Sequence, residues 1–308
     1  MQIISCICPM RAISSEQWKH IRRADLERIS WEVLRMLEYI GQMFSYPFMQ
    51  RAFLVGILIS ICASLLGVSL VLKRYSMIGD GLSHVGFGAL AVASALHLAP
   101  LSVAIPVVIL AAFLLLRLSE NGKLKGDAAI AMFSTGALAI GVMVVSLTTG
   151  MNSDLNSYMF GSILAMSKSD VVLSVVLAVV VLILYVFFYN KIFAVTFDPV
   201  FARATGVRTD LYNMLLAVLT AVTVVLGMRM MGALLISSLI IFPALTAMRL
   251  CRHYRSVILC ALVLSVCSFV LGLVMSFLFA TPTGASIVVV DILFYCIFWL
   301  ISAIKYRG

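Results

Sequence analysis

Charged side chains are scarce in this chain of 308 residues. Asp, Glu, Lys and Arg make up 11% of it, whereas 63% of the residues are hydrophobic and the mean hydropathy is +1.13. A soluble domain is typically about a quarter charged and about half apolar. The composition therefore excludes an ordinary soluble domain and predicts a polytopic membrane protein, with room for one membrane domain only.

Several signatures of enzymes and of closed metal sites are also missing. No two of the seven cysteines have CxxC spacing, which argues against disulfides and a structural zinc site. The four histidines are scattered and no HExxH is present, which argues against an intramembrane metalloenzyme. No phosphate-binding loop of the Walker type occurs, so we do not expect this chain to hydrolyse ATP.

Long apolar runs predict the fold. A run of about 20 apolar residues is long enough to cross a bilayer as a helix. We therefore expect an all-α polytopic bundle of about nine transmembrane helices. The predicted spans lie near 50–72, 76–98, 100–118, 128–149, 171–189, 211–228, 230–249, 257–279 and 284–302.

The basic residues predict the orientation of these helices. Lys and Arg are enriched in cytoplasmic loops, so the net charge of +9 indicates a membrane topology and not a nucleic-acid partner. Residues 150–170 would then face outwards, as a re-entrant or interfacial segment. The basic positions expected inside are Lys73, Arg74, Arg117, Lys123, Lys125, Lys191, Arg203, Arg208, Arg249, Arg252, Arg255, Lys305 and Arg307.

The amino-terminal residues 1–42 do not fit this topology. Residues 11–35 carry six basic residues on the side where the rule disfavours them. Either this extension is an amphipathic helix on the cytoplasmic face, or translation begins at Met43. We favour the second interpretation, which leaves 43–308 as a single transmembrane domain.

Two ionisable side chains stand one helical turn apart inside a predicted span. Asp80 and His84 are four residues apart and share one helix face. Ionisable groups in hydrocarbon are costly and usually mark an ion or proton path. A carboxylate and an imidazole are ligands that a divalent transition metal accepts, so the pair suggests an intramembrane metal site. The alternative is that Asp80 lies at the membrane surface and His84 only bonds a neighbouring helix.

Other residues near this pair have structural explanations. Ser83 is either a second-shell hydrogen-bond donor or a packing residue, and we favour packing. Glycines 79, 81, 86 and 88 are expected to let neighbouring helices approach closely.

In the last span, Asp291 either pairs with Arg229 or faces a wet cavity.

A short capped helix is predicted between the fifth and sixth spans. Asp198 followed by Pro199 reads as an N-cap and the first helical position. Ala202 and Ala204 continue the helix, and Gly206 can end it. With small residues on its surface, this cytoplasmic helix could dock into a groove on another protein, or it could be an ordinary capped turn.

Taken together, these segments resemble the membrane permease subunit of bacterial ABC importers for zinc and manganese. The resemblance covers essentially all of 43–302 and depends on motifs in a fixed order. They are residues 45–52 (Ser-Tyr-Pro-Phe-Met-Gln-Arg-Ala), 79–84 (Gly-Asp-Gly-Leu-Ser-His), 160–164 (Phe-Gly-Ser-Ile-Leu), 198–206, 232–235 (Gly-Ala-Leu-Leu) with Pro243-Ala244, and 282–285 (Pro-Thr-Gly-Ala).

The resemblance implies a type II-like permease in the bacterial cell membrane. It implies a dimer of permease chains, a cytoplasmic ATPase docked on a coupling helix near 198–206, and an extracytoplasmic metal-binding protein. The residues matching Asp80 and His84 are taken in the family as intramembrane metal ligands; no permanently bound cofactor is implied. This chain has Ala280 where the family commonly has aspartate.

Zinc is the first expectation for the transported ion, and manganese or iron is the alternative. A more remote alternative is an ATP-independent secondary transporter or channel that uses Asp80 and His84 as a proton relay. Such a protein would give the 198–206 segment no ATPase to bind.

Overall fold

The computed structural model describes residues 41, 45–120, 126–148, 161 and 168–305. The chain divides into one unit up to Pro47 and a second from Phe48 onwards, and the second contains every helix considered below. The amino-terminal extension, most of the segment 150–170 and the basic residues of 121–125 lie outside the described residues. The topology predicted for those segments therefore stays a prediction.

All regular secondary structure in the described residues is helical, which confirms the all-α prediction. Each of the nine predicted spans corresponds to one helix. Two further short helices, α8 and α9, fall between the fifth and sixth spans. In chain order the helices are α2 (Pro47–Leu72), α3 (Ile78–Ala95), α4 (Pro100–Glu120), α5 (Gly126–Leu147), α7 (Lys168–Phe187), α8 (Tyr189–Phe197), α9 (Pro199–Ala204), α10 (Thr209–Met231), α11 (Ala233–Leu250), α12 (Tyr254–Phe279) and α13 (Thr283–Lys305).

Two of the nine span helices differ from the others. Seven helices of the described chain are long and apolar enough to cross a membrane. The remaining two are α3, whose 18 residues include Asp80 and His84, and α11, in which Leu235–Leu250 forms a shorter apolar stretch. These two helices contact each other. The polar pair suggested by the sequence therefore lies on α3, beside α11.

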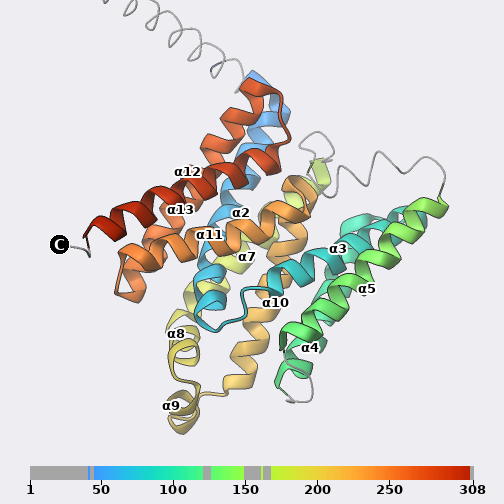
Figure 1. The fold of residues 1–308 in the computed structure, drawn as a ribbon. Coiled ribbons are helices and arrows are strands. Elements are labelled where there is room, and N and C mark those ends of the chain that lie inside the picture. The colour runs from blue at the N-terminus through green and yellow to red at the C-terminus, as the bar shows by residue number, and fades with distance from the viewer. Residues whose placement is uncertain (1–40, 42–44, 121–125, 149–160, 162–167, 306–308) are drawn as a thin grey trace, which may run out of the picture. The chain divides into compact units, whose positions relative to one another are not determined.

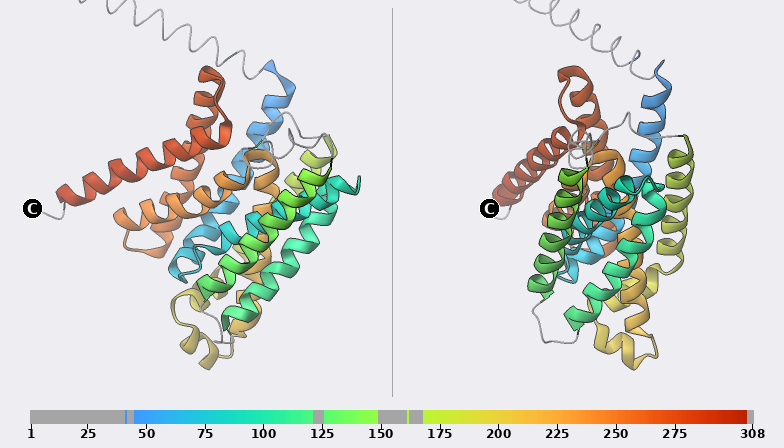
Figure 2. Two further views of the ribbon diagram at one scale, coloured as in Figure 1. Left: turned by 45° about the vertical axis from the view of Figure 1, so that its right-hand side comes forward. Right: turned by 90° about the vertical axis from the view of Figure 1, so that its right-hand side faces the viewer.

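Helix α3 is surrounded by other helices because its glycines leave room for them. It packs against α4, α5, α10 and α11, and Figures 1 and 2 show α3, α4 and α5 running beside one another. A Cβ at Gly88 would lie 2.6 Å from the carbonyl oxygen of Ala137 in α5, and one at Gly86 would lie 2.6 Å from Met228 in α10. The close approach predicted at these glycines is confirmed.

Helix α2 contacts α11 just as closely. A Cβ at Gly67 would lie 2.1 Å from the backbone oxygen of Ile240. The Cδ1 of Ile240 also lies 3.1 Å from the position of a Cβ at Gly79. Ile240 of α11 thus fills the space between α2 and the start of α3. This contact determines which part of α11 lies beside Asp80 and His84.

The prediction for the buried charges of the later spans was wrong. Arg229 pairs with Asp170 at the start of α7, at 3.0 Å between Nη2 and Oδ2, and not with Asp291. Asp291 is 3% exposed, so it does not face a wet cavity either. Local spacing could not identify Asp170 as the partner, because it lies 59 residues before Arg229 and on another helix.

The contact between α2 and α11 generates a prediction about stability. We expect Gly67→Ala to lower the free energy of unfolding by about 1–3 kcal/mol, because the added methyl group meets backbone atoms that cannot move independently. Gly136→Ala is the matched control, since nothing lies within 4 Å of a Cβ there. Denaturant titration of both variants in the same detergent measures the effect, and equal stability of the two would contradict this account of the contact.

Candidate functional site

The side chains of Asp80 and His84 face each other on the first two turns of α3. The Nε2 atom of His84 lies 3.7 Å from Oδ2 of Asp80. The side chains are 19% exposed for His84 and 38% exposed for Asp80. Four-residue spacing on a helix thus brings the two groups together as predicted, with one side of the pair open towards the outside of this chain.

Sequence reasoning missed a third polar group at this position. Ser237, in the second turn of α11, donates from Oγ to Oδ1 of Asp80 at 3.4 Å, and it is 9% exposed. It lies 157 residues from Asp80 in sequence. In the sequence it lies in the predicted span 230–249, and that position does not identify a partner.

Ser83 serves the backbone of its own helix. Its Oγ donates to the carbonyl oxygen of Asp80 at 2.7 Å, and the residue is fully buried. A hydroxyl bonded to a carbonyl three residues earlier does not reach the carboxylate of Asp80. The structure therefore supports packing, and not a second-shell position, for Ser83.

The site offers an incomplete set of metal ligands. Asp80 contributes carboxylate oxygens and His84 an imidazole nitrogen. Within the described part of the chain, no group of three or more His, Cys, Asp and Glu residues could hold a metal ion. A closed zinc site needs four ligands, so an ion held here would complete its coordination with water, backbone oxygens or groups from another molecule.

The predicted capped helix is present as α9. Oδ1 of Asp198 accepts a hydrogen bond from the backbone N–H of Phe201 at 2.8 Å, and Pro199 is the first helical residue. The helix ends before Gly206, which has φ +83°. Only glycine adopts this left-handed conformation without strain, so the predicted start and end are both confirmed.

The exposed surface of α9 differs from the expected one. Ala202 is fully buried, so the expectation that it lies on the surface is wrong, whereas Ala204 is exposed as expected. The exposed face instead carries two large apolar side chains, Val200 at 78% and Phe201 at 63% exposure. Two neighbouring exposed apolar side chains on a short helix offer a surface that a partner protein can cover.

A cluster of aromatic rings links α8, which leads into α9, to the bundle. The ring of Tyr254, at the start of α12, lies 4.9 Å from Phe193 and 5.5 Å from Phe197 of α8, centroid to centroid. Its hydroxyl lies 3.0 Å from Oγ of Ser69 in α2 and 3.3 Å from the hydroxyl of Tyr185 in α7. Tyr254 therefore connects four helices at one point.

The family of the chain follows from its sequence as a whole. Residues 45–302 match the model of the ABC 3 transport family. The chain belongs to the ABC 3 transport family. It is thus a multi-pass membrane permease subunit of an ABC transporter and not itself an enzyme, because the ATPase of such transporters is a separate subunit.

Curated relatives of this permease carry the names of three different metals. The chain is 27% identical to the manganese transport system membrane protein MntC of Halalkalibacterium halodurans, over 82% of this chain and 86% of that one. It is 30% identical to a probable iron transport system membrane protein of Haemophilus influenzae, over 88% and 100%. It is 29% identical to the high-affinity zinc uptake system membrane protein ZnuB of Haemophilus influenzae, over 77% and 91%.

Solved structures agree with this assignment. The permease resembles a chain of PsaBC from Streptococcus pneumoniae, solved in complex with Fab, with a TM-score of 0.77 and 29% identity over 85% of this chain and 95% of that chain. It also shares the fold of a putative metal-chelate type ABC transporter in an inward-facing conformation, with a TM-score of 0.67 and 13% identity over 83% and 86%.

The Tyr254 cluster generates a prediction about the permease. We expect Tyr254→Phe to lower the free energy of unfolding by about 1 kcal/mol, because the hydroxyl loses its partners but the ring stays. We expect Tyr254→Ala to lower it by about 3–5 kcal/mol, because the ring is lost as well. Unfolding of both variants in detergent tests this, and equal losses would show that the ring contacts with α8 contribute nothing.

Proposed function

We propose that this permease imports a divalent transition metal ion, with zinc as the first candidate and manganese or iron as the alternative. The observation that carries the proposal is the pair of Asp80 and His84 on α3, 3.7 Å apart and closed on one side by Ser237 of α11. One nitrogen and one carboxylate from a single helix form half of a tetrahedral site.

An incomplete site is suited to transport. An ion that crosses a membrane must bind well enough to enter and weakly enough to leave. Two strong ligands from one chain, with the remaining positions filled by water or by a second chain, meet both requirements. The partial exposure of Asp80 and His84 supports exchange of the ion with its surroundings.

Fewer observations support zinc in particular than support a divalent transition metal in general. Imidazole and carboxylate together accept both zinc and manganese. The relatives named for manganese, iron and zinc transport are similarly distant, at 27%, 30% and 29% identity. The preference for zinc comes from the likeness to the zinc branch in residues 45–52 and 79–84.

The proposed partners follow from the surface of α9 and from the family. A cytoplasmic ATPase would dock on α9, with Asp198, Pro199 and Gly206 fixing the shape of the helix and Ala204 lying in the contact. A second copy of this permease would form a homodimer, and an extracytoplasmic metal-binding protein would deliver the ion. The proton-relay alternative needs no ATPase, so co-purification of an ATPase with the tagged permease distinguishes the two.

Removal of either metal ligand tests the proposal. We expect Asp80→Ala and His84→Ala to abolish metal uptake into proteoliposomes while the permease still inserts and binds its ATPase, because each variant removes half of the protein's ligands. Ser237→Ala should weaken the apparent affinity for the metal about tenfold or more, since outer contacts orient the ligands. Ser146→Ala, whose hydroxyl donates to the backbone of its own helix α5, is the control. Normal uptake by both the Asp80 and the His84 variant would refute the site.

Charge on α9 tests the docking surface. Ala204→Glu should weaken ATPase binding or uncouple hydrolysis from uptake, because a carboxylate cannot enter a tight contact without losing hydration. Ser256→Glu, at an exposed position in the first turn of α12, is the control. Ala202→Glu should instead destabilise the permease, because that position is buried. If Ala204→Glu binds the ATPase and couples as well as the wild type, α9 is not the docking helix.

A further inference from the structure

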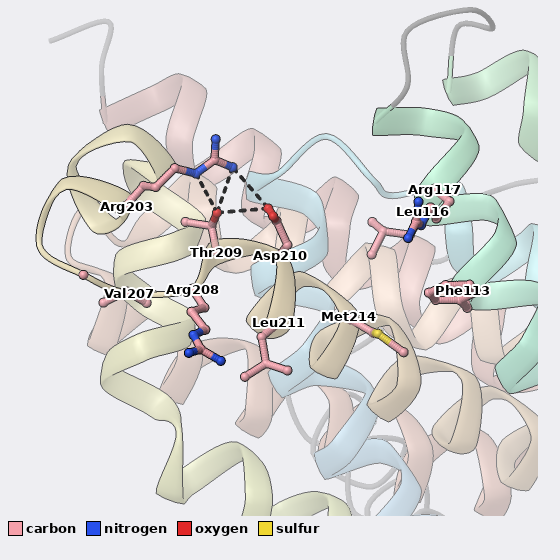
Figure 3. Close-up of a pocket in the computed structure, with 11 residues that line it drawn as sticks. Phe113, Leu116, Arg117, Arg203, Val207, Arg208, Thr209, Asp210, Leu211 and Met214 are labelled. Atoms are coloured by element: carbon pink, nitrogen blue, oxygen red, sulfur yellow. Dashed lines mark hydrogen bonds and ion pairs between the residues drawn. The ribbon is translucent and has the colours of Figure 1, made fainter.

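We propose that a groove between the ends of α4 and α10 binds an anionic phospholipid of the inner leaflet. The groove has a cavity of about 580 Å³ at the turn between α9 and α10, shown in Figure 3. Its rim is basic and its walls are apolar. Neither the ion site nor the docking face of α9 explains this combination.

The basic rim has more positive than negative charge. Three arginines line the cavity, Arg117 from α4, Arg203 from α9 and Arg208 directly before α10, and Asp210 is the one acidic residue among its lining. Three positive charges and one negative charge give the lining a net charge of +2. Asp210 pairs with Arg203 at 3.1 Å, which directs the excess charge to Arg117 and Arg208. A neighbouring hollow of about 220 Å³ shares Arg208 and adds Lys191.

Each of these two arginines stands beside apolar residues that line the same cavity. On α4, the guanidinium group of Arg117 lies over the ring of Phe113, 5.7 Å from its centroid, and Leu116 also belongs to the lining. On α10, Arg208 is followed at spacings of three residues by Leu211 and Met214, which line the cavity and are exposed. The cavity wall therefore combines apolar side chains from α4 and α10.

This arrangement matches the chemistry of a phospholipid. A phosphate-bearing headgroup would bind to the guanidinium groups at the rim, which form paired hydrogen bonds with phosphate. An acyl chain would follow Phe113 and Leu116 of α4 and Met214 of α10, which line the cavity. Basic pockets between helices on the cytoplasmic side are sites where anionic headgroups bind.

An ATPase subunit fits the same surface less well. In the proposed orientation, Arg117 and Arg208 lie at the cytoplasmic membrane surface, but Phe113 and Met214 of the same cavity lie further inside the spans. A soluble protein can contact the arginines and cannot reach Phe113 or Met214. The continuous lining from cations to apolar side chains inside the spans therefore favours a lipid.

Lipid retention by the purified full-length permease tests the proposal. Native mass spectrometry after exchange into mixed micelles containing equal amounts of phosphatidylglycerol and phosphatidylcholine would measure which lipid stays bound. We expect retention of phosphatidylglycerol, and a loss of roughly tenfold or more in the double variant Arg117→Gln/Arg208→Gln. Arg255→Gln, an exposed basic residue in the first turn of α12, is the control and should retain the lipid.

The outcomes separate the proposal from its alternatives. The double variant Arg117→Lys/Arg208→Lys keeps the charge and should retain most of the lipid if it folds, which circular dichroism checks independently. Equal retention of both lipids, or equal loss in Arg255→Gln, would overturn the proposal. If the glutamine variant keeps phosphatidylglycerol but loses the ATPase, the groove belongs to the ATPase, and if it changes only the oligomeric state, the groove belongs to a second permease chain. The measurement uses no metal, so its result does not depend on whether the proposed ion site is correct.

Discussion

The structure depends on one constraint: two ionisable side chains must be accommodated inside an apolar helix bundle. Asp80 and His84 satisfy part of their polar requirement with each other and part through Ser237. Helix α3 can hold them because its glycines allow the backbone of α5 and the Met228 side chain of α10 to pack closely against it. Replacing this close packing with larger side chains would open the bundle around a charge, which is costly in hydrocarbon.

The same packing joins the Asp80 and His84 pair to α8 and α9. Phe197 of α8 contacts Tyr254, and Tyr254 bonds Ser69 near the end of α2. Two residues earlier on α2, Gly67 contacts Ile240 of α11, which in turn meets Gly79 one residue before Asp80. A movement of α8 and α9 would therefore be passed through packed contacts to the helices that carry Asp80 and Ser237. Interfaces this tight shift between discrete arrangements and do not deform smoothly.

The sequence could predict the features that depend on local spacing. The apolar runs predicted the helices, four-residue spacing predicted the facing of Asp80 and His84, and Asp198, Pro199 and Gly206 predicted both ends of α9. Contacts between distant helices could not be predicted this way. Ser237 beside Asp80 and Asp170 beside Arg229 depend on how helices pack, and a single sequence does not encode which helix lies next to which.

Burial within a short helix was also beyond local reasoning. Alanine at 202 and alanine at 204 look equivalent in the sequence, but two residues on a helix differ by about 200° in direction. Ala202 therefore faces the chain and Ala204 faces away. The apolar character of the docking face came from Val200 and Phe201, whose exposure only the structure shows.

The most direct test of the account is X-ray absorption spectroscopy at the metal edge of the permease loaded with zinc. If the ion binds at Asp80 and His84, we expect a shell of nitrogen and oxygen atoms. One imidazole nitrogen should lie at about 2.0–2.1 Å and should be lost in the His84→Ala variant. The same shell, imidazole signal included, in both the wild type and the His84 variant would show that the ion does not bind at this site. A shell containing sulfur would contradict the account as well.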